Sequence, residues 1–183
     1  MNPRLAAAFA ILVLPTAAAA QPAPAPADAP ASIVLSPANE PGTPLRISGV
    51  VTGPDGHPLA RASIYVYQTD AAGIYNPANP RDSDHPRLNG HLRTDARGRF
   101  SYTTVRPGSY PGTRNPGHIH YHVNAPGFAE RVFEIVFEGD SLIPEQWRRD
   151  AANPLAAVAI VRLTAGANGA LAGEHTVALR PAR

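Results

Sequence analysis

The chain consists of short runs in which polar and apolar residues alternate, and turn residues end each run within a few positions. Alternation with a period of two is typical of a strand that buries one face, and Gly, Pro, Asp and Asn are the residues that tight turns require. Only residues 144–151, "PEQWRRDA", favour a short helix. We therefore predict an all-β fold, a β-sandwich of about seven to eight strands. The predicted strands are residues 45–52, 61–69, 99–105, 118–124, 131–137, 157–163 and 175–179.

Two predicted connections, residues 70–92 and 106–117, are much longer than ordinary turns. Connections of about 12 residues or more without secondary structure are uncommon, and they often carry functional residues. Each contains a tyrosine outside any predicted strand, Tyr75 in "AAGIYNP" and Tyr110 in "PGSYPG". Either tyrosine alone could be a hydrophobic plug, but two such residues that bracket a histidine-rich strand favour a functional site.

The predicted strand 118–124 reads "HIHYHVN" and places His118, His120 and His122 on one face. Alternate residues of a strand lie about 7 Å apart, so two of these imidazoles can converge on one metal ion. Imidazole suits iron, copper and zinc, and phenolate suits a high-valent ion such as Fe³⁺. Two tyrosinates and one hydroxide would balance the charge of a buried ferric ion. The alternative is a half-buried strand with an ordinary polar face.

Composition excludes several classes of function. The 183 residues are 44% hydrophobic and 16% charged, which fits one globular domain. There is no cysteine, so disulfides and thiol chemistry are excluded. The formal net charge is only +2 and no run of arginines forms a basic stripe, so we expect no nucleic-acid partner.

The first 20 residues, "MNPRLAAAFAILVLPTAAAA", combine Arg4, an apolar run and small residues. This layout is typical of a secretory signal peptide, and we expect cleavage after Ala20. The apolar run is too short for a membrane span, so we expect no membrane anchor after cleavage and a periplasmic or secreted protein. Residues 21–32, rich in Pro and Ala, are predicted to be an extended linker, and residues 33–183 the folded domain.

Three segments resemble the intradiol ring-cleavage dioxygenases, the family of protocatechuate 3,4-dioxygenase and catechol 1,2-dioxygenase: "ISGVVTGPDGHPLARASIYVYQTDAAGIYN", "RTDARGRFSYTTVRPGSYP" and "HIHYHV". The order Tyr, Tyr, His-x-His is the most specific part, whereas transthyretin-like binding modules share the first segment. The resemblance implies a transthyretin-like (prealbumin-like) β-sandwich with long functional loops. It covers the core of the family without the helical dimerisation segment of the catechol 1,2-dioxygenase type, and a homo-oligomer remains open.

The resemblance also implies a site and a reaction. A ferric ion, Fe(3+), would be held by Tyr75, Tyr110, His118 and His120. The substrates would be a catechol and O2, and the aromatic ring would be cleaved between its two hydroxylated carbons to give a muconate-type diacid. Tyr75 would be both ligand and base, accepting a catechol proton, while Tyr110 would stay bound.

Two positions depart from the family pattern. An arginine that the family places three residues before the first histidine is Asn115 here, with Arg114 one residue earlier. A glutamine on the following strand aligns with Glu134. We take Arg114 and Glu134 as candidate catalytic residues beside the substrate. Glu134 is expected either to pair with Arg114 or another arginine, or to remain a free carboxylate that repels acidic substrates.

The remaining histidines and the strand tyrosines have simpler interpretations. His122 is predicted to support a ligand histidine or to face solvent rather than to bind the metal. His91 lies in the long loop after Tyr75 and could approach the site, although a surface position is the simpler interpretation. Three histidines are predicted at the surface and three tyrosines as ordinary sheet residues: His57, His85, His175, Tyr65, Tyr67 and Tyr102.

Two other functions are compatible with these residues. One is a non-catalytic transthyretin-like binding module whose histidines are structural or bind another metal. The other is a periplasmic copper or zinc carrier that uses His118, His120 and His122. Neither requires tyrosines in the two long loops, so Tyr75 and Tyr110 favour the dioxygenase.

Overall fold

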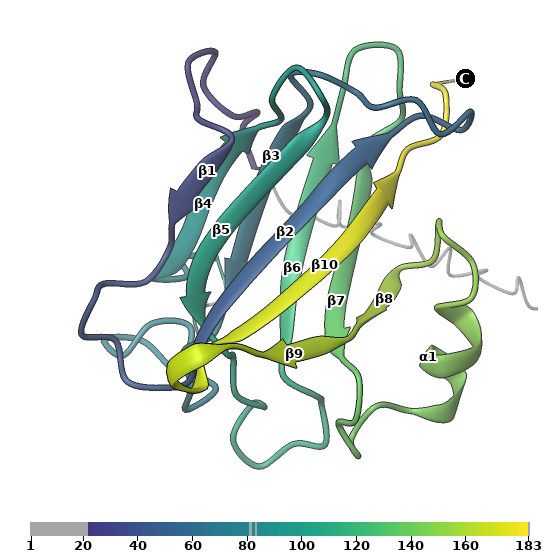
Figure 1. Ribbon diagram of the computed structural model, residues 1–183. Helices are drawn as coiled ribbons and strands as arrows, with labels where there is room; N and C mark the ends of the chain where they lie inside the picture. The colour runs from purple at the N-terminus through teal and green to yellow at the C-terminus, as the bar shows by residue number, and fades with distance from the viewer. Residues whose placement is uncertain (1–21, 81, 83, 183) are drawn as a thin grey trace, which may run out of the picture.

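The computed structural model describes residues 22–80, 82 and 84–182, so the predicted signal peptide lies outside the described residues. Two five-stranded sheets pack face to face (Figure 1), and the predicted all-β sandwich is confirmed. The described part of the chain contains ten strands rather than seven or eight. Among the described residues, no helix is long and apolar enough to cross a membrane.

Both sheets are mixed: two of the four neighbouring pairs are antiparallel in the first sheet, and three of the four in the second. The first sheet has the order β1-β5-β2-β10-β9, and the second has the order β4-β3-β6-β7-β8. The strands of the first sheet are β1 (Ser32–Val34), β2 (Pro44–Thr52), β5 (Arg99–Val105), β9 (Leu163–Ala165) and β10 (Leu171–Ala178). Those of the second are β3 (Ser63–Gln68), β4 (Leu88–Arg93), β6 (His118–Asn124), β7 (Arg131–Phe137) and β8 (Val158–Val161). A short helix α1 (Glu145–Asp150) and a 3₁₀ turn η1 (Ala167–Gly169) lie outside the sheets.

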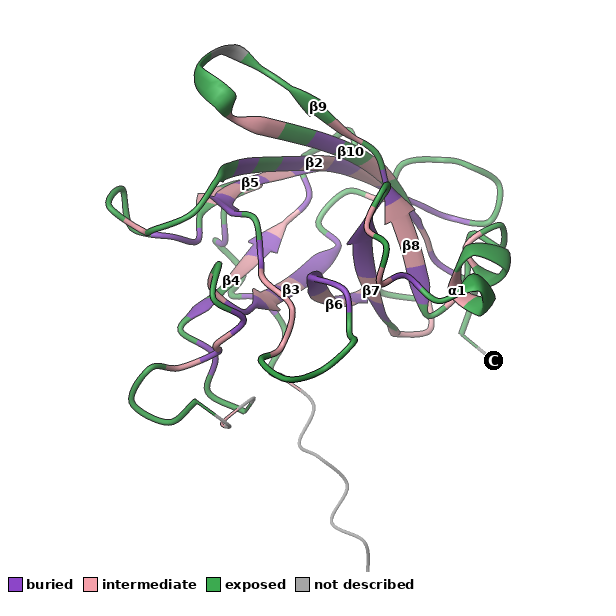
Figure 2. Cartoon of the chain, turned by 90° about the horizontal axis from the view of Figure 1, so that it is seen from below, coloured by how far each residue is buried: buried purple, intermediate pink, exposed green. Residues whose placement is uncertain are grey.

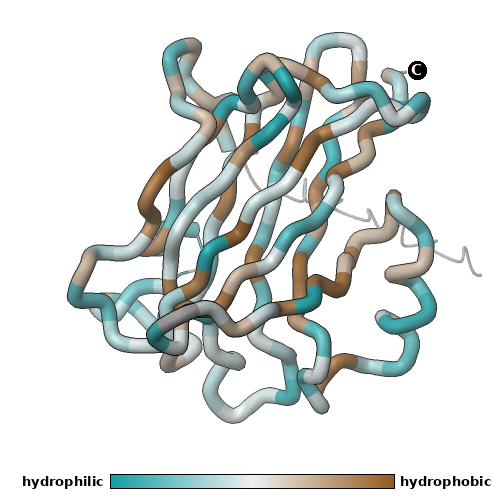
Figure 3. Tube along the Cα trace, viewed as in Figure 1, coloured by the Kyte–Doolittle hydropathy of each residue, from teal (hydrophilic) through white to brown (hydrophobic). Residues whose placement is uncertain are grey.

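The core forms between the two inward faces. Buried residues gather on the strands between the sheets, as Figure 2 shows, whereas α1 and most loops are exposed. Hydropathy follows the same division in Figure 3, where apolar segments alternate with polar ones along the strands. The alternation predicted from the sequence thus decides which face of each strand is buried. Side chains that are fully buried include Ile47, Ile64, Tyr102, Ile119, Tyr121 and Ile135.

Strand β4 corrects the prediction that residues 70–92 are irregular throughout. Its Leu88 and Leu92 are buried, and the strand pairs with β3 at the edge of the second sheet. Two apolar residues four positions apart among polar neighbours do not show a strand by alternation, because an edge strand buries few side chains. Residues 88–93 therefore form a strand because they pair with β3, and their own sequence pattern does not predict it.

His175 corrects the prediction of a surface position. It points inward from β10 together with Val177, and its ring centroid lies 5.3 Å from that of Tyr121. Its Nε2 is 3.2 Å from the hydroxyl of Tyr121, which also contacts the hydroxyl of Tyr102. Burial, with Arg131 nearby, lowers the pKa of His175 to about 4, so the imidazole is neutral near pH 7.

The described part of the predicted linker, residues 22–32, lies against the domain: Ser32 already begins β1, and residues 22–31 run along the surface. Ala25 is buried, and its N–H donates to Ser63 Oγ at 2.7 Å. The guanidinium of Arg93 donates to the carbonyl oxygens of Ala25 and Pro26 at 2.6 and 2.8 Å. The segment has no regular secondary structure, as expected of a proline-rich chain, but these contacts make it part of the domain surface rather than a free spacer.

Candidate metal centre

Two long loops and the start of β6 meet at one end of the sandwich, the lower end in Figure 1. The loop after β3 carries Tyr75, and the loop between β5 and β6 carries Tyr110. His118 is the first residue of β6, and His120 follows on the same outward face. The strand period therefore places both imidazoles beside the two loops.

The side chains of Tyr75, Tyr110, His118 and His120 meet there through four polar atoms, which form a closed ring. Tyr75 Oη lies 2.5 Å from Tyr110 Oη and 2.7 Å from His120 Nε2. Tyr110 Oη lies 2.8 Å from His118 Nε2, and the two Nε2 atoms are 3.0 Å apart. The four residues predicted as ligands are thus brought together within hydrogen-bond distance.

The outer nitrogens of the two histidines show where the imidazole protons lie. His118 Nδ1 lies 2.7 Å from the carbonyl oxygen of Pro116, which can only accept a hydrogen bond. His120 Nδ1 lies 3.3 Å from the Glu134 carboxylate. We therefore assign both protons to Nδ1, which leaves a lone pair on each Nε2 facing the tyrosines.

This assignment leaves too few protons for the ring. Only the hydroxyl protons of Tyr75 and Tyr110 are available for the four contacts, so two contacts join lone pairs without a hydrogen between them. A cation held by all four atoms would remove this conflict, because each lone pair could then be directed at positive charge. The donor set of two phenol oxygens and two imidazole nitrogens fits a metal ion of high charge.

Burial favours the neutral forms of Tyr75, Tyr110 and His120. Burial raises the pKa of Tyr75, and the contact with Tyr110 raises it further. Burial also raises the pKa of Tyr110. Burial lowers the pKa of His120 to about 3, and the neighbouring His118 and His122 contribute. The buried phenols would lose their protons only to a compensating positive charge, which is what a bound metal ion supplies.

Glu134 lies on β7 directly opposite His120, and its carboxylate faces the His120 imidazole. Of the two alternatives expected for Glu134, the ion pair with Arg114 or another arginine is not seen among the described residues, because the strand register places the carboxylate against the imidazole. His118, His120 and Glu134 could also hold a metal ion, since one ligand atom of each lies within 4.8 Å of the others. However, Glu134 faces the Nδ1 side of His120, whereas the tyrosines face Nε2. We therefore assign Glu134 the role of orienting His120.

Arg114 lies in the loop before β6 and is exposed. Within the described residues, no hydrogen bond or ion pair of its side chain is seen. The structure therefore does not bring Arg114 into the ring, and its contact with a substrate stays a prediction.

Tyr67 is a residue of the site that sequence reasoning missed. It lies on β3 opposite His120, and the two rings stack with their centroids 4.4 Å apart and an interplanar angle of 7°. Burial raises the pKa of Tyr67 to about 12, so it remains a neutral phenol. Its alternation with Ile64 and Val66 predicts the outward face, but only the pairing of β3 with β6 shows which histidine it meets.

Asp70 connects the two loops that carry the tyrosines. Its Oδ1 accepts from the N–H groups of Ala72 and Ile74 at 2.9 and 3.0 Å, which shapes the turn before Tyr75. Its backbone carbonyl accepts from the N–H of Gly108, in the loop of Tyr110, at 2.9 Å. One residue therefore fixes the spacing of both loops.

Arg87 secures the other side of the Tyr75 loop. Its N–H donates to the carbonyl oxygen of Tyr75 at 2.9 Å, and its guanidinium binds Glu40 through two contacts of 2.6 and 2.7 Å. The hydrogen bond from Arg87 lowers the pKa of Glu40, so the pair is ionised near pH 7. A two-contact arginine–carboxylate pair is directional, and it holds the loop in one position.

The remaining histidines lie outside the ring. His122 shares the outward face of β6, and its Nδ1 is 3.5 Å from Glu130 Oε1. His91 lies on β4, where its ring centroid is 4.6 Å from that of Tyr65. His57 and His85 are exposed, as predicted.

Gly73 allows the two tyrosine loops to approach each other, and we predict that Gly73→Ala destabilises the protein strongly. Both Gly73 and Gly112 have positive φ, +82° and +73°, so alanine at either site costs about 1 kcal/mol. A Cβ at Gly73 would lie 1.9 Å from the Ser109 carbonyl oxygen, whereas a Cβ at Gly112 meets no atom within 4 Å. We expect a further loss of about 1–3 kcal/mol at Gly73 alone. Urea unfolding of both variants measures this difference, and equal losses would contradict it.

The fold and the site together define a class of protein: a β-sandwich in which two loop tyrosines and a His-x-His strand meet in one ring that could hold a metal ion. Residues 20–180 match the family model described as Dioxygenase. This chain belongs to the intradiol ring-cleavage dioxygenase family.

Similar proteins are named as dioxygenases. Catechol 1,2-dioxygenase 2 of Acinetobacter lwoffii is 34% identical over 125 residues, which are 58% of this chain and 44% of that protein. The protocatechuate 3,4-dioxygenase beta chain of Burkholderia cepacia is 32% identical over 112 residues, 56% of this chain and 48% of that protein. The matches therefore span less than half the length of these relatives.

Solved structures share the fold. The dioxygenase domain of a dioxygenase–carbohydrate-binding protein fusion from Streptomyces sp. SirexAA-E superposes with a TM-score of 0.63 and is 28% identical. That alignment covers 85% of this chain and 91% of the domain. The 3-chlorocatechol 1,2-dioxygenase of Rhodococcus opacus 1CP superposes with a TM-score of 0.64 at 24% identity, over 82% of this chain and 64% of that one. The second likeness shows the fold alone.

Proposed function

We propose that this protein is an iron(III) dioxygenase that cleaves the ring of a catechol between its two hydroxylated carbons, using O2. The observation that carries the proposal is the ring formed by Tyr75, Tyr110, His118 and His120, which has two phenol oxygens, two imidazole nitrogens and too few protons. These four residues would hold the ion. When bound, ferric iron would supply Lewis acidity that lowers the pKa of catechol hydroxyls.

The side chains of the site divide the remaining tasks. Burial raises the pKa of Tyr75, so a free Tyr75 phenolate is a strong base, and we assign its Oη the acceptance of one catechol proton. Tyr110 has the other phenol oxygen and would remain a ligand. Glu134 at Nδ1 and the stacked ring of Tyr67 keep His120 Nε2 directed at the tyrosines.

The proposal is tested by loading the purified protein with iron and recording its metal content, visible spectrum and products. Phenolate bound to ferric iron gives a broad visible band, so we expect a red-brown protein that converts catechol to a muconate-type diacid. A colourless protein that retains zinc or copper after iron loading would favour a metal carrier instead. A coloured protein that leaves every catechol intact would also overturn the proposal.

We predict that the protein prefers uncharged catechols to protocatechuate, because Glu134 stands beside His120. At a separation of about 8 Å and an effective dielectric constant near 20, two negative charges repel by roughly 2 kcal/mol, about 30-fold in affinity. Glu134→Gln is expected to lower the ratio of kcat/KM for catechol to kcat/KM for protocatechuate. Glu138→Gln removes the same charge from an exposed residue after β7 and is the control. Wild-type protein that uses protocatechuate as well as catechol would contradict the prediction.

We also propose export, on the strength of the signal-peptide layout of residues 1–20. The full-length chain produced in a Gram-negative host is expected in the periplasm or the medium, with Gln21 as its first residue. N-terminal sequencing of the recovered protein measures this. Retention of Met1 in the cytoplasm would contradict export.

A further inference from the structure

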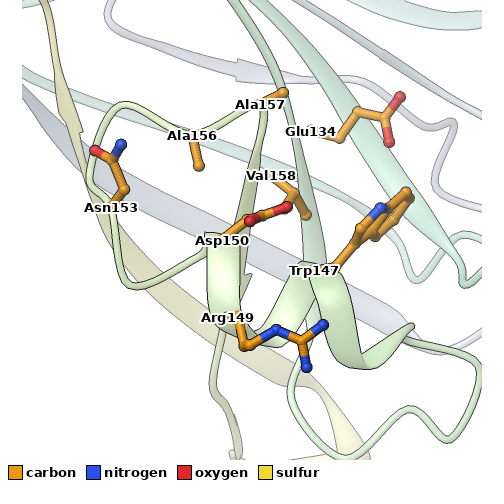
Figure 4. A pocket seen from close by; sticks show the side chains of 8 residues that line it. All are labelled: Glu134, Trp147, Arg149, Asp150, Asn153, Ala156, Ala157 and Val158. Carbon is orange, nitrogen blue, oxygen red and sulfur yellow. The ribbon is translucent and has the colours of Figure 1, made fainter.

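A pocket of about 550 Å³ lies between α1 and the strands β7 and β8 (Figure 4). Glu134 of β7 lines one side, and Trp147 and Asp150 of α1 line another. Trp147 packs against the buried cluster of Val136, Ile143 and Val158, so the indole rests on the domain core. The pocket is therefore a feature of the folded domain rather than a gap beside a loose helix.

Glu134 joins this pocket to the metal centre. Its Oε1 is 3.3 Å from Nδ1 of His120, and the same side chain lines the pocket. A catechol bound beside the four donor atoms could therefore extend a substituent past Glu134 toward Trp147.

The lining of the pocket has negative character. Asp150 accepts from Gln146 Nε2 at 2.7 Å through Oδ1, which leaves its second oxygen available. Arg149 also lines the pocket, but its guanidinium donates to Gln146 Oε1 at 2.8 Å and lies 3.5 Å from the Glu145 carboxylate. In Figure 4 the Asp150 carboxylate is directed toward Val158, whereas the Arg149 guanidinium lies at the bottom of the view and Glu134 near the top. Two carboxylates thus remain beside one indole.

We propose that this pocket is a subsite for the ring substituent of a catechol, and that it selects a substituent ending in an ammonium group. The inference rests on the proposed function and names the substrate class within it. An ammonium group is attracted both to the face of an indole and to carboxylates. A carboxylate substituent would be repelled, and an apolar one would remove water from Glu134 and Asp150 without replacing it.

The first test compares three catechols of equal chain length, in which the ring carries 2-aminoethyl, propyl or 2-carboxyethyl at position 4. We expect kcat/KM to fall in that order, because the carboxylates attract the ammonium group and repel the carboxylate group. Partial exposure to solvent weakens both effects and limits each step to about 10-fold. Asp150→Asn should lower the preference for the amine over the propyl compound by about 3-fold, because Glu134 and the indole of Trp147 remain. Glu174→Gln, on β10 of the opposite sheet, removes the same charge and should leave the preference unchanged. Equal use of the three catechols would overturn the subsite.

The second test does not depend on iron or on turnover. Trp147 is the only tryptophan in the chain, so its fluorescence reports directly on the pocket. Phenethylamine added to iron-free protein is expected to change the emission saturably, with about 3-fold weaker binding in Asp150→Asn. An equal response to 3-phenylpropanoate, or none to phenethylamine, would overturn the subsite even if catechol is cleaved. Selective amine binding without cleavage of any catechol would support the pocket and overturn the proposed function.

Discussion

Protein carrying His120→Ala is expected to lose its stoichiometric iron, and His118→Ala is expected to do the same. Each Nε2 lies within 3.0 Å of the other and contacts one tyrosine, so removing either imidazole leaves three donors and an open side. Loss of an orienting partner usually weakens metal binding 10–100-fold, and loss of a ligand should exceed about 100-fold. The measurement is iron per chain after dialysis against a weak chelator.

His122→Ala provides the matched control, because it removes an imidazole from the same face of the same strand. The structure places His122 against Glu130 rather than in the ring, so its loss should change iron affinity by at most about 10–100-fold. Circular dichroism of all three variants checks that β6 still folds. If His122→Ala removes iron as thoroughly as the other two, the ligand assignment is wrong.

Tyr110→Phe and Tyr75→Phe are expected to have different effects, the first on iron binding and the second on turnover. Phenylalanine keeps the aromatic packing of either residue, including the centroid distance of 5.6 Å between the two rings, and removes only the hydroxyl. Tyr110 has the oxygen assigned to remain a ligand, so its loss should remove most iron and most colour. Tyr75 has the oxygen assigned as base, so its loss should leave some coloured iron but lower kcat about 10²–10⁴-fold.

Iron content, the visible band and kcat/KM for catechol, recorded on the same preparations, distinguish the two tyrosines. A coloured but slow Tyr75→Phe beside a nearly colourless Tyr110→Phe supports the two roles. Indistinguishable losses in the two variants would argue against the role of Tyr75 as a base.

We expect the departures at Asn115 and Glu134 to affect substrate choice while the four donor atoms stay in place. Neither residue belongs to the ring of four donor atoms, and the Glu134 carboxylate faces the outer nitrogen of His120. The carboxylate therefore replaces an uncharged glutamine of the family pattern without disturbing the donor set. The predicted preference against acidic catechols follows from this charge.

Much of the fold and part of the site could be predicted from the sequence, because both depend on local pattern. The period of two along each strand decides which side chains face the core, so the sandwich and the shared face of His118 and His120 follow from the residues alone. The length of the loops and their isolated tyrosines, Tyr75 and Tyr110, likewise mark a functional site without reference to any neighbour.

Only the tertiary structure decided which distant residues meet. The pairing of β6 with β3 and β7 sets Tyr67 and Glu134 on either side of His120, and shifting either register by one residue would turn one of them inward. The hydrogen bonds of Asp70 bring the two loops together, and the inward face of β10 brings His175 against Tyr121. Such contacts join positions tens of residues apart and leave no periodic trace along the chain, so neither propensity nor spacing reveals them.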